Sequence, residues 1–207
     1  MELKYGTWKI SSYEPADARA LCAAGFSPIT AALLCSRGYR DAGAAREFLS
    51  CSYPLSSPFA LLDMDKAAAR VKQALARREH IAVFGDYDVD GITATCLLTE
   101  YLRSKGGHVT SYIPARLEEG YGLNPIAIDT LKKQGVELIV TVDCGITGVD
   151  ETAYAATLGV DLVITDHHEC KEALPEATAV VDPHRPDCSY PFKHLAGVGV
   201  ALKLVLA

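Results

Sequence analysis

From residue 81 onward, short runs of apolar and β-branched residues alternate with longer helical stretches. The short runs, which predict strands, lie at 81–85, 108–114, 138–143, 162–166 and 179–182. The longer stretches, which predict helices, lie at 91–105, 125–134 and 147–158. This alternation predicts an α/β fold with a doubly wound, mostly parallel sheet and helices on both faces. Ligands of such sheets bind just beyond the carboxyl ends of the strands.

The first part of the chain has a different pattern. Three stretches predict short helices between turn-rich segments, at 15–24, 28–37 and 41–49. Residues 63–79 predict a longer helix, with Val71 and Leu75 four apart on one face. We therefore expect a small helical N-terminal segment over residues 1–60 and an α/β domain over residues 61–207.

The composition is that of a globular protein, with 49% hydrophobic and 22% charged residues among 207. No apolar run reaches the ~20 residues that span a bilayer. The first residues lack the basic-then-apolar layout of a signal peptide. The seven cysteines include no CxxC pair, and an odd number without a secretion signal indicates reduced thiols and a cytoplasmic protein.

The formal net charge of −6 is unevenly distributed. Residues 1–80 hold 11 Lys and Arg against 8 Asp and Glu, whereas residues 81–207 hold 9 against 18. The acidic excess therefore lies in the predicted α/β domain, which also contains the candidate metal ligands described below. Two bound divalent cations would cancel four of these charges, so the net charge does not argue against a nucleic-acid substrate.

The segment GDYDVDG places three carboxylates, Asp86, Asp88 and Asp90, directly after the first predicted strand. Carboxylates this close repel one another and raise each other's pKa, and bound divalent cations resolve that conflict. A calcium loop of the DxDxDG type is the alternative, but it needs a bidentate Glu at its twelfth position. Counted from Asp86, that position holds Leu97, which disfavours calcium.

Two further predicted strands end in candidate ligands. VTVDCG supplies Asp143, and VITDHHE supplies Asp166, His167 and His168. A lone Asp after a strand is often a turn residue, and a lone His is usually structural. Two adjacent histidines after an Asp are harder to explain in that way. The carboxylate-rich mixture with imidazole favours Mn²⁺ or Mg²⁺ over Fe²⁺ or Zn²⁺.

A structural zinc site is another alternative. Five His and Cys residues lie within 22 residues: His167, His168, Cys170, His184 and Cys188. Structural zinc prefers paired ligands with short, regular spacing, whereas His184 lies in the Pro-bounded segment DPHRPD. We therefore interpret the cysteines as small buried apolar residues rather than ligands.

A parallel sheet gathers the carboxyl ends of its strands along one edge, so the three groups of candidate ligands should form one site. This convergence predicts a hydrolase that uses more than one metal ion. Two metal ions a few ångströms apart can activate water and stabilise both oxygens of an in-line phosphoryl displacement.

Taken in order, GDYDVDG, VTVDCG and DHH resemble the first three motifs of the DHH phosphoesterase family. Within that family, the segments at 57–71, 113–124 and 190–204 are similar to the bacterial single-stranded-DNA-specific exonucleases. The resemblance covers essentially the whole chain. It implies two divalent cations, with Mn²⁺ favoured over Mg²⁺, and single-stranded DNA as the substrate.

The resemblance also implies metal-binding roles by matching position. Asp88 would bind the first metal ion and Asp90 the second. Asp143 would bridge both ions, and His167 would bind the second. Asp86 matches no ligand by position, but it would compensate at the first ion for a family ligand that this chain lacks.

Other residues would act on the substrate phosphate. His168 would face the phosphate, and Asp166 would orient the histidines or a neighbouring helix terminus. Arg116 would grip phosphate, unless it forms a surface ion pair with a neighbouring glutamate. Gly197 and Gly199 would let the backbone approach phosphate at a helix start, unless they serve close helix–sheet packing.

The sequence departs from the family pattern in two ways. Phe84 stands where pyrophosphatase-like members have a His, which argues against that activity and explains a compensating role for Asp86. The family's last metal-binding Asp has no counterpart, because Asp182 and Asp187 follow the DHH motif too closely. Since residues 195–207 predict a helix that is cut short, we expect a truncated domain that binds metal weakly and has little nuclease activity by itself.

The resemblance thus implies a metal-dependent 5′→3′ exonuclease that releases 5′-mononucleotides from single-stranded DNA in recombination and repair. A helicase and a single-strand-binding protein would be its partners. One alternative is a DHH phosphodiesterase that cleaves nanoRNA or cyclic dinucleotides. The other is a catalytically inactive DHH scaffold in replication and repair, against which the retained, mutually repelling carboxylates argue.

Overall fold

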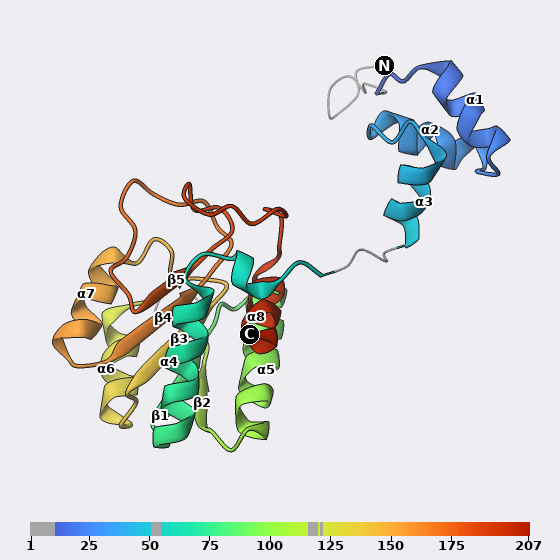
Figure 1. The fold of residues 1–207 in the computed structure, drawn as a ribbon. Helices are drawn as coiled ribbons and strands as arrows, with labels where there is room; N and C mark the ends of the chain where they lie inside the picture. The colour runs from blue at the N-terminus through green and yellow to red at the C-terminus, as the bar shows by residue number, and fades with distance from the viewer. Residues whose placement is uncertain (1–10, 51–54, 116–119, 121) are drawn as a thin grey trace. The chain divides into compact units, whose positions relative to one another are not determined.

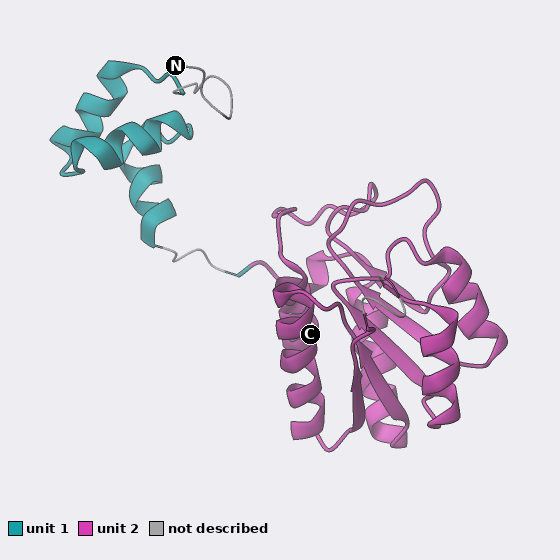
Figure 2. Ribbon diagram, turned by 180° about the vertical axis from the view of Figure 1, so that it is seen from behind, with its two compact units in different colours: residues 1–55 teal, residues 56–207 magenta. Residues whose placement is uncertain are grey.

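The computed structural model describes residues 11–50, 55–115, 120 and 122–207. The chain forms two compact units, residues 1–55 and residues 56–207 (Figure 2). The predicted domain boundary near residue 60 stays a prediction, because compactness alone does not show that either part folds by itself. Within the described ranges, no helix is both long and apolar enough to cross a membrane.

The first unit is helical. It contains α1 (Pro15–Ala23), α2 (Pro28–Ser36) and α3 (Ala42–Ser50). Ser27 begins α2, because its Oγ accepts a hydrogen bond from the Thr30 amide at 3.2 Å and Pro28 follows at a position where no amide donor is needed. The helices share a small apolar core of Leu21, Ala31, Leu34, Cys35 and Ala45.

The second unit is built on five parallel strands in the order β2-β1-β3-β4-β5 (Figure 1). The strands are β1 (His80–Phe84), β2 (His108–Tyr112), β3 (Leu138–Val142), β4 (Asp161–Thr165) and β5 (Ala179–Val181). Every residue of β1 and β3 is buried, which explains why their sequences are nearly continuous apolar runs rather than alternating ones. The predicted parallel sheet is confirmed.

Helices cover both faces of this sheet, as predicted. After the short 3-10 helix η1 (Pro58–Ala60), the chain forms α4 (Met64–Arg77), α5 (Val89–Ser104), α6 (Pro125–Lys133), α7 (Val149–Thr157) and α8 (Gly197–Leu206). Helices α4, α5 and α8 share one apolar cluster with Val83 and Val140. Helices α6 and α7 share another with Phe84 and Ile139. Adjacent residues of one strand thus point to opposite faces.

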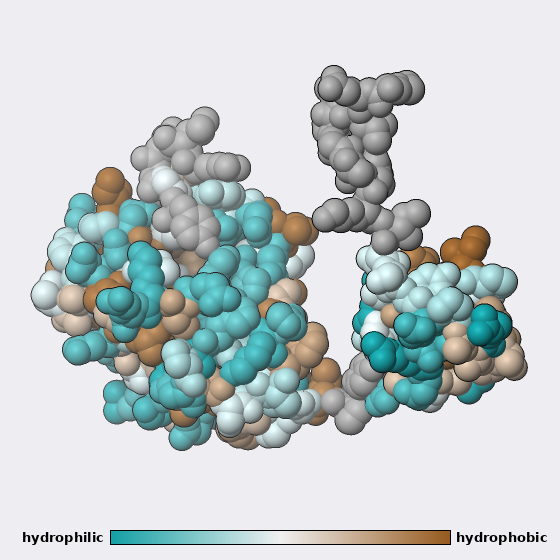
Figure 3. Space-filling model, turned by 90° about the horizontal axis from the view of Figure 1, so that it is seen from above, coloured by the Kyte–Doolittle hydropathy of each residue, from teal (hydrophilic) through white to brown (hydrophobic). Residues whose placement is uncertain are grey.

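The strand order reverses between β1 and β3. The chain leaves β1 for β2 on one side and then returns to the other side of β1 to form β3, β4 and β5. The carboxyl edge at such a reversal is where open α/β sheets bind ligands. This edge lies at the top of Figure 1, and Figure 3 looks down on it; the described residues seen there are mostly hydrophilic.

Candidate metal centre

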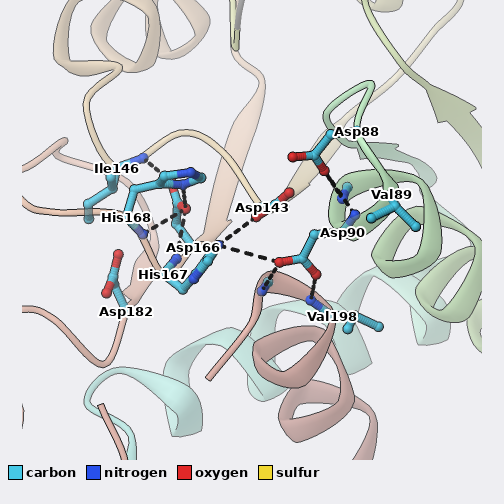
Figure 4. A network of polar contacts seen from close by, with 12 residues as sticks. Asp88, Val89, Asp90, Asp143, Ile146, Asp166, His167, His168, Asp182 and Val198 are labelled. Carbon is cyan, nitrogen blue, oxygen red and sulfur yellow. Dashed lines mark hydrogen bonds and ion pairs between the residues drawn. The ribbon is translucent and has the colours of Figure 1, made fainter. Parts of the chain in front are cut away.

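The candidate ligands follow β1, β3 and β4, which are neighbours in the sheet. The register pairs Phe84 with Thr141, and Val142 with Thr165, so the three strands end at nearly the same level. Their carboxyl ends bring the GDYDVDG, VTVDCG and DHH segments into one cluster of side chains (Figure 4).

Asp143 lies at the centre of this cluster and is only 1% exposed. Ligand atoms of Asp86, Asp88 and Asp143 all lie within 4.8 Å of one another, and so do ligand atoms of Asp143, His167 and His168. Asp143 therefore belongs to both groups. A carboxylate shared in this way is what two metal ions a few ångströms apart require.

The backbone of Asp143 leaves β3 in the left-handed region, with φ at +61°. Asp and Asn adopt this conformation more readily than other non-glycine residues, and sparsely populated conformations concentrate at functional sites. The Asp143 amide donates to the Thr165 carbonyl at 3.1 Å, which ties the turn to β4. The carboxylate is thereby turned toward His167, whose Nε2 lies 2.9 Å from Asp143 Oδ1.

The centre gathers buried negative charges that favour the binding of cations. Burial, followed by the negative charges of Asp90 and Asp88, raises the pKa of Asp143 to about 7. Buried carboxylates that repel one another gain most when a divalent cation neutralises them. The donor set of several carboxylates and an imidazole therefore fits Mn²⁺ or Mg²⁺.

The GDYDVDG segment does not stay extended, because α5 begins at Val89. Asp88 is the N-cap of this helix, and its Oδ1 accepts hydrogen bonds from the amides of Asp90 at 2.8 Å and Gly91 at 3.0 Å. A Cβ at Gly91 would lie 2.5 Å from the Asp86 carbonyl oxygen, so only glycine fits this turn. Asp88 thus lies with Asp86 and Asp143, whereas Asp90 reaches the start of α8 and His167.

Asp90 caps the start of α8. Its Oδ2 accepts from the Gly197 amide at 2.7 Å and its Oδ1 from the Val198 amide at 2.8 Å, a favourable position for a negative charge. The same Oδ2 lies 3.5 Å from His167 Nε2, so Asp90 adjoins the second ligand group without being one of its three members. Its role as a metal ligand stays a prediction. Phosphate binding at Gly197 would require Asp90 to release this amide.

Asp166 organises the DHH segment. Its Oδ1 accepts from the amides of His167 at 2.7 Å and His168 at 3.2 Å, and from His168 Nδ1 at 2.7 Å. Its Oδ2 accepts from the Ile146 amide at 2.9 Å. The bond to Asp166 raises the pKa of His168 to about 9. A protonated imidazole donates hydrogen bonds to anions, so His168, whose side chain is 44% exposed, is suited to a phosphate.

In the sequence, Asp182 follows the DHH motif too closely to match the family's last metal-binding Asp, yet the structure places it at the edge of the centre (Figure 4). Asp182 follows β5 and is fully buried, and burial raises its pKa to about 6. Its Oδ2 has no hydrogen-bond partner among the described residues. The signal was present in the sequence, because Asp182 follows the apolar run AVV just as Asp143 follows VTV and Asp166 follows VIT.

The remaining candidate residues lie apart from the centre or outside the described ranges. Arg116 lies outside the described residues. Phe84 is fully buried and stacks on Tyr112 at 5.4 Å, so it belongs to the apolar core. Among the described residues, no potential metal-binding group includes Cys170, His184 or Cys188, and the zinc alternative gains no support.

Comparison with known proteins gives one consistent result. The description "DHH family, N-terminal domain" matches residues 80–206. The single-stranded-DNA-specific exonuclease RecJ of Bacillus subtilis is 46% identical over 182 residues, which are 87% of this chain and 23% of that protein. The first curated relatives are matched over only 23% to 33% of their length.

Two solved structures share the fold of this chain over the parts that superpose. RecJ bound to manganese superposes with a TM-score of 0.67 at 36% identity, covering 73% of this chain and 38% of that one. RecJ from Thermus thermophilus in complex with Mn²⁺ superposes with a TM-score of 0.71 at 30% identity, covering 95% of this chain and 27% of that one.

Proposed function

The chain belongs to the DHH family, and on that premise we propose that its protein is a metal-dependent exonuclease that degrades single-stranded DNA in the 5′→3′ direction and releases 5′-mononucleotides. The observation that carries the proposal is the position of Asp143, which is shared by two groups of ligands. The similarity to RecJ over most of the chain favours single-stranded DNA over small phosphodiesters as the substrate.

We propose that the site holds two divalent cations, with Mn²⁺ preferred to Mg²⁺, and that Asp143 would be a ligand of both. Asp86 and Asp88 would hold the first cation, and His167 the second, with Asp90 close enough to contribute. When bound, the cations supply an activated water and charge neutralisation at the phosphoryl oxygens.

The protein's own side chains would do the rest. His168, kept protonated by Asp166, would donate to a non-bridging phosphate oxygen and stabilise the charge that develops there. Asp166 would keep both histidines in place through their amides. Arg116 stays a prediction as a second phosphate contact. The proposal further includes a cytoplasmic location and cooperation with a helicase and a single-strand-binding protein.

The test is hydrolysis of a 5′-labelled single-stranded oligonucleotide by the full-length protein, with Mn²⁺ and with EDTA. A duplex and a dinucleotide serve as parallel substrates. Metal-dependent release of 5′-mononucleotides from the single strand alone is expected. Cleavage of the dinucleotide alone would instead assign the protein to the small phosphodiesterases, and cleavage of neither substrate would favour an inactive scaffold.

Metal binding should also stabilise the fold. A ligand that binds only the folded state, at a concentration about 100 times its dissociation constant, raises the free energy of unfolding by ~2.7 kcal/mol. For a domain of this size, that corresponds to a rise of roughly 5–10 °C in the melting temperature. We expect this rise when Mn²⁺ is added to the EDTA-treated full-length protein. Asp150→Asn, which changes an exposed carboxylate in the first turn of α7, should keep it. A scaffold without metal would show no rise.

A further inference from the structure

Strand β5 brings a fourth strand end to the metal centre. The Asp166 amide donates to the Val181 carbonyl at 3.0 Å, so Asp182 lies beside Asp166 at the carboxyl edge. The chain then turns back, because Asp182 Oδ1 accepts from the His184 amide at 2.7 Å. Pro183, with its fixed φ, stiffens this turn. The turn places the His184 ring against the DHH segment.

His184 contacts the main chain of His167. Its Nδ1 lies 2.5 Å from the His167 carbonyl oxygen. A carbonyl oxygen only accepts hydrogen bonds, so Nδ1 carries the proton and this bond fixes the tautomer of the ring. The side chain of His167 reaches the metal centre, with Nε2 at 2.9 Å from Asp143 Oδ1. His184 therefore contacts Asp143 at the centre of the metal site only indirectly, through His167.

Both polar backbone atoms of His167 are fixed by side chains. Asp166 Oδ1 accepts from the His167 amide at 2.7 Å, and His184 donates to the His167 carbonyl. The two supports come from different strand ends, β4 and β5. Because the backbone is held on both sides, the direction in which the His167 ring leaves the main chain is set before any metal ion binds.

The turn that carries His184 is itself anchored. Arg185, which is nearly buried, donates from Nη1 to the Val180 carbonyl at 2.6 Å. Lys193 donates from Nζ to the Pro183 carbonyl at 2.6 Å. Hydrogen bonds from charged donors are stronger than neutral ones. His184 is therefore presented by a fixed support and not by a loose loop.

We propose that His184 is a positioning residue of the metal centre: its Nδ1–H holds the His167 carbonyl and so aims His167 Nε2 at the second metal ion. The proposal rests on the proposed function in one respect, that His167 binds metal. Residues that orient metal ligands typically change metal affinity or activity about 10- to 100-fold. The effect of His184 should therefore appear in metal binding itself.

Three substitutions in the full-length protein test the role of Nδ1. We expect His184→Ala to weaken Mn²⁺ binding, measured by titration calorimetry, by roughly 10- to 100-fold. His184→Asn should restore most of the affinity, because its amide nitrogen occupies the place of Nδ1. His184→Gln should stay weak, since its amide nitrogen corresponds to Nε2. His194→Ala is the matched control, because this exposed ring packs edge-on against His184 at 6.4 Å, and it should keep wild-type affinity.

Unfolding in EDTA separates positioning from general stability. A His184→Ala variant with wild-type Mn²⁺ affinity would overturn the proposal, whether or not its melting temperature falls. Equal rescue by Asn and Gln would overturn it as well, and this comparison remains if the Ala variant fails to fold. Since calorimetry needs no DNA, a protein that binds Mn²⁺ but cleaves no single strand would contradict the proposed function and leave this test intact.

Discussion

Replacement of Asp143 by Asn is expected to abolish metal-dependent nuclease activity and yet leave the metal-free protein at least as stable as the wild type. The Asp143 carboxylate belongs to both ligand groups, and an amide cannot offer two negatively charged oxygens to two cations. The loss should exceed the ~10- to 100-fold effect of residues that only support a ligand. Asn matches Asp in size and tolerates the φ of +61° at this position, so the turn is kept.

The stability of this variant should depend on pH in a defined direction. Burial and the charges of Asp90 and Asp88 raise the pKa of Asp143 from 3.8 to about 7. Between these values the folded protein binds a proton that the unfolded chain has released, so the stability of the wild type falls as the pH rises. The amide of Asp143→Asn carries no charge at any of these pH values. The variant's advantage in EDTA should therefore grow from about pH 4 to pH 7 and then level off, with an upper bound of about 4 kcal/mol.

Three measurements on the full-length protein check both expectations: nuclease activity with Mn²⁺, calorimetric Mn²⁺ affinity, and thermal unfolding in EDTA between about pH 5 and pH 8. Asp150→Asn removes an exposed carboxylate and serves as the control. Full activity in Asp143→Asn would refute the bridging role. A variant that melts below the wild type in EDTA at the upper end of this pH range would show that the buried charge does not destabilise the folded state.

The sheet was predictable because its strands are buried on both faces. The runs IAVFG and LIVTVD are almost entirely apolar up to their last residue for that reason, and they correspond to β1 and β3. The end of β3 shows the limit of such patterns. Asp143 was predicted as the last residue of a strand, but it lies just beyond β3 in the left-handed region. Hydrophobicity alone does not report the backbone turn that aims its carboxylate.

The convergence of three strand ends was also predictable, because it follows from parallel topology. The family resemblance assigns Asp88 and Asp90 to different metal ions, but the local pattern of GDYDVDG does not show what separates the two side chains. Asp88 and Asp90 diverge because α5 begins between them, and Asp90 is held by amides of α8 that lie 107 and 108 residues further along the chain. Asp182 was set aside because it follows the DHH motif so closely, although β5 pairs with β4 and carries it to the same edge. Contacts between distant segments have no local signature.

The sequence leaves two explanations open for the glycines at the start of α8: contact with a phosphate, or close packing. The space around Gly197 and Gly199 differs in a way that bears on this choice. An ideal Cβ at Gly197 would lie 2.4 Å from Asp143 Oδ1 and 2.6 Å from Asp143 Cβ. At Gly199 the nearest atom would be Leu195 Cδ2 at 3.2 Å, the end of a flexible side chain that can move aside. This overlap supports close packing against the metal centre as a role of Gly197, while contact with phosphate stays a prediction for both glycines.

Gly197→Ala is expected to displace Asp143 or α8. Mn²⁺ binding should weaken at least as much as on loss of a supporting residue, roughly 10- to 100-fold. The free energy of unfolding should fall by about 1–3 kcal/mol. Gly199→Ala is the matched control, with the same substitution two residues later, and should keep Mn²⁺ affinity and stability near wild type. Calorimetry, unfolding in EDTA and the KM for single-stranded DNA distinguish the two explanations. If Gly197 mattered only for phosphate, the Ala variant would raise the KM and bind Mn²⁺ normally; overlap with Asp143 instead requires Mn²⁺ affinity to fall before any DNA is added.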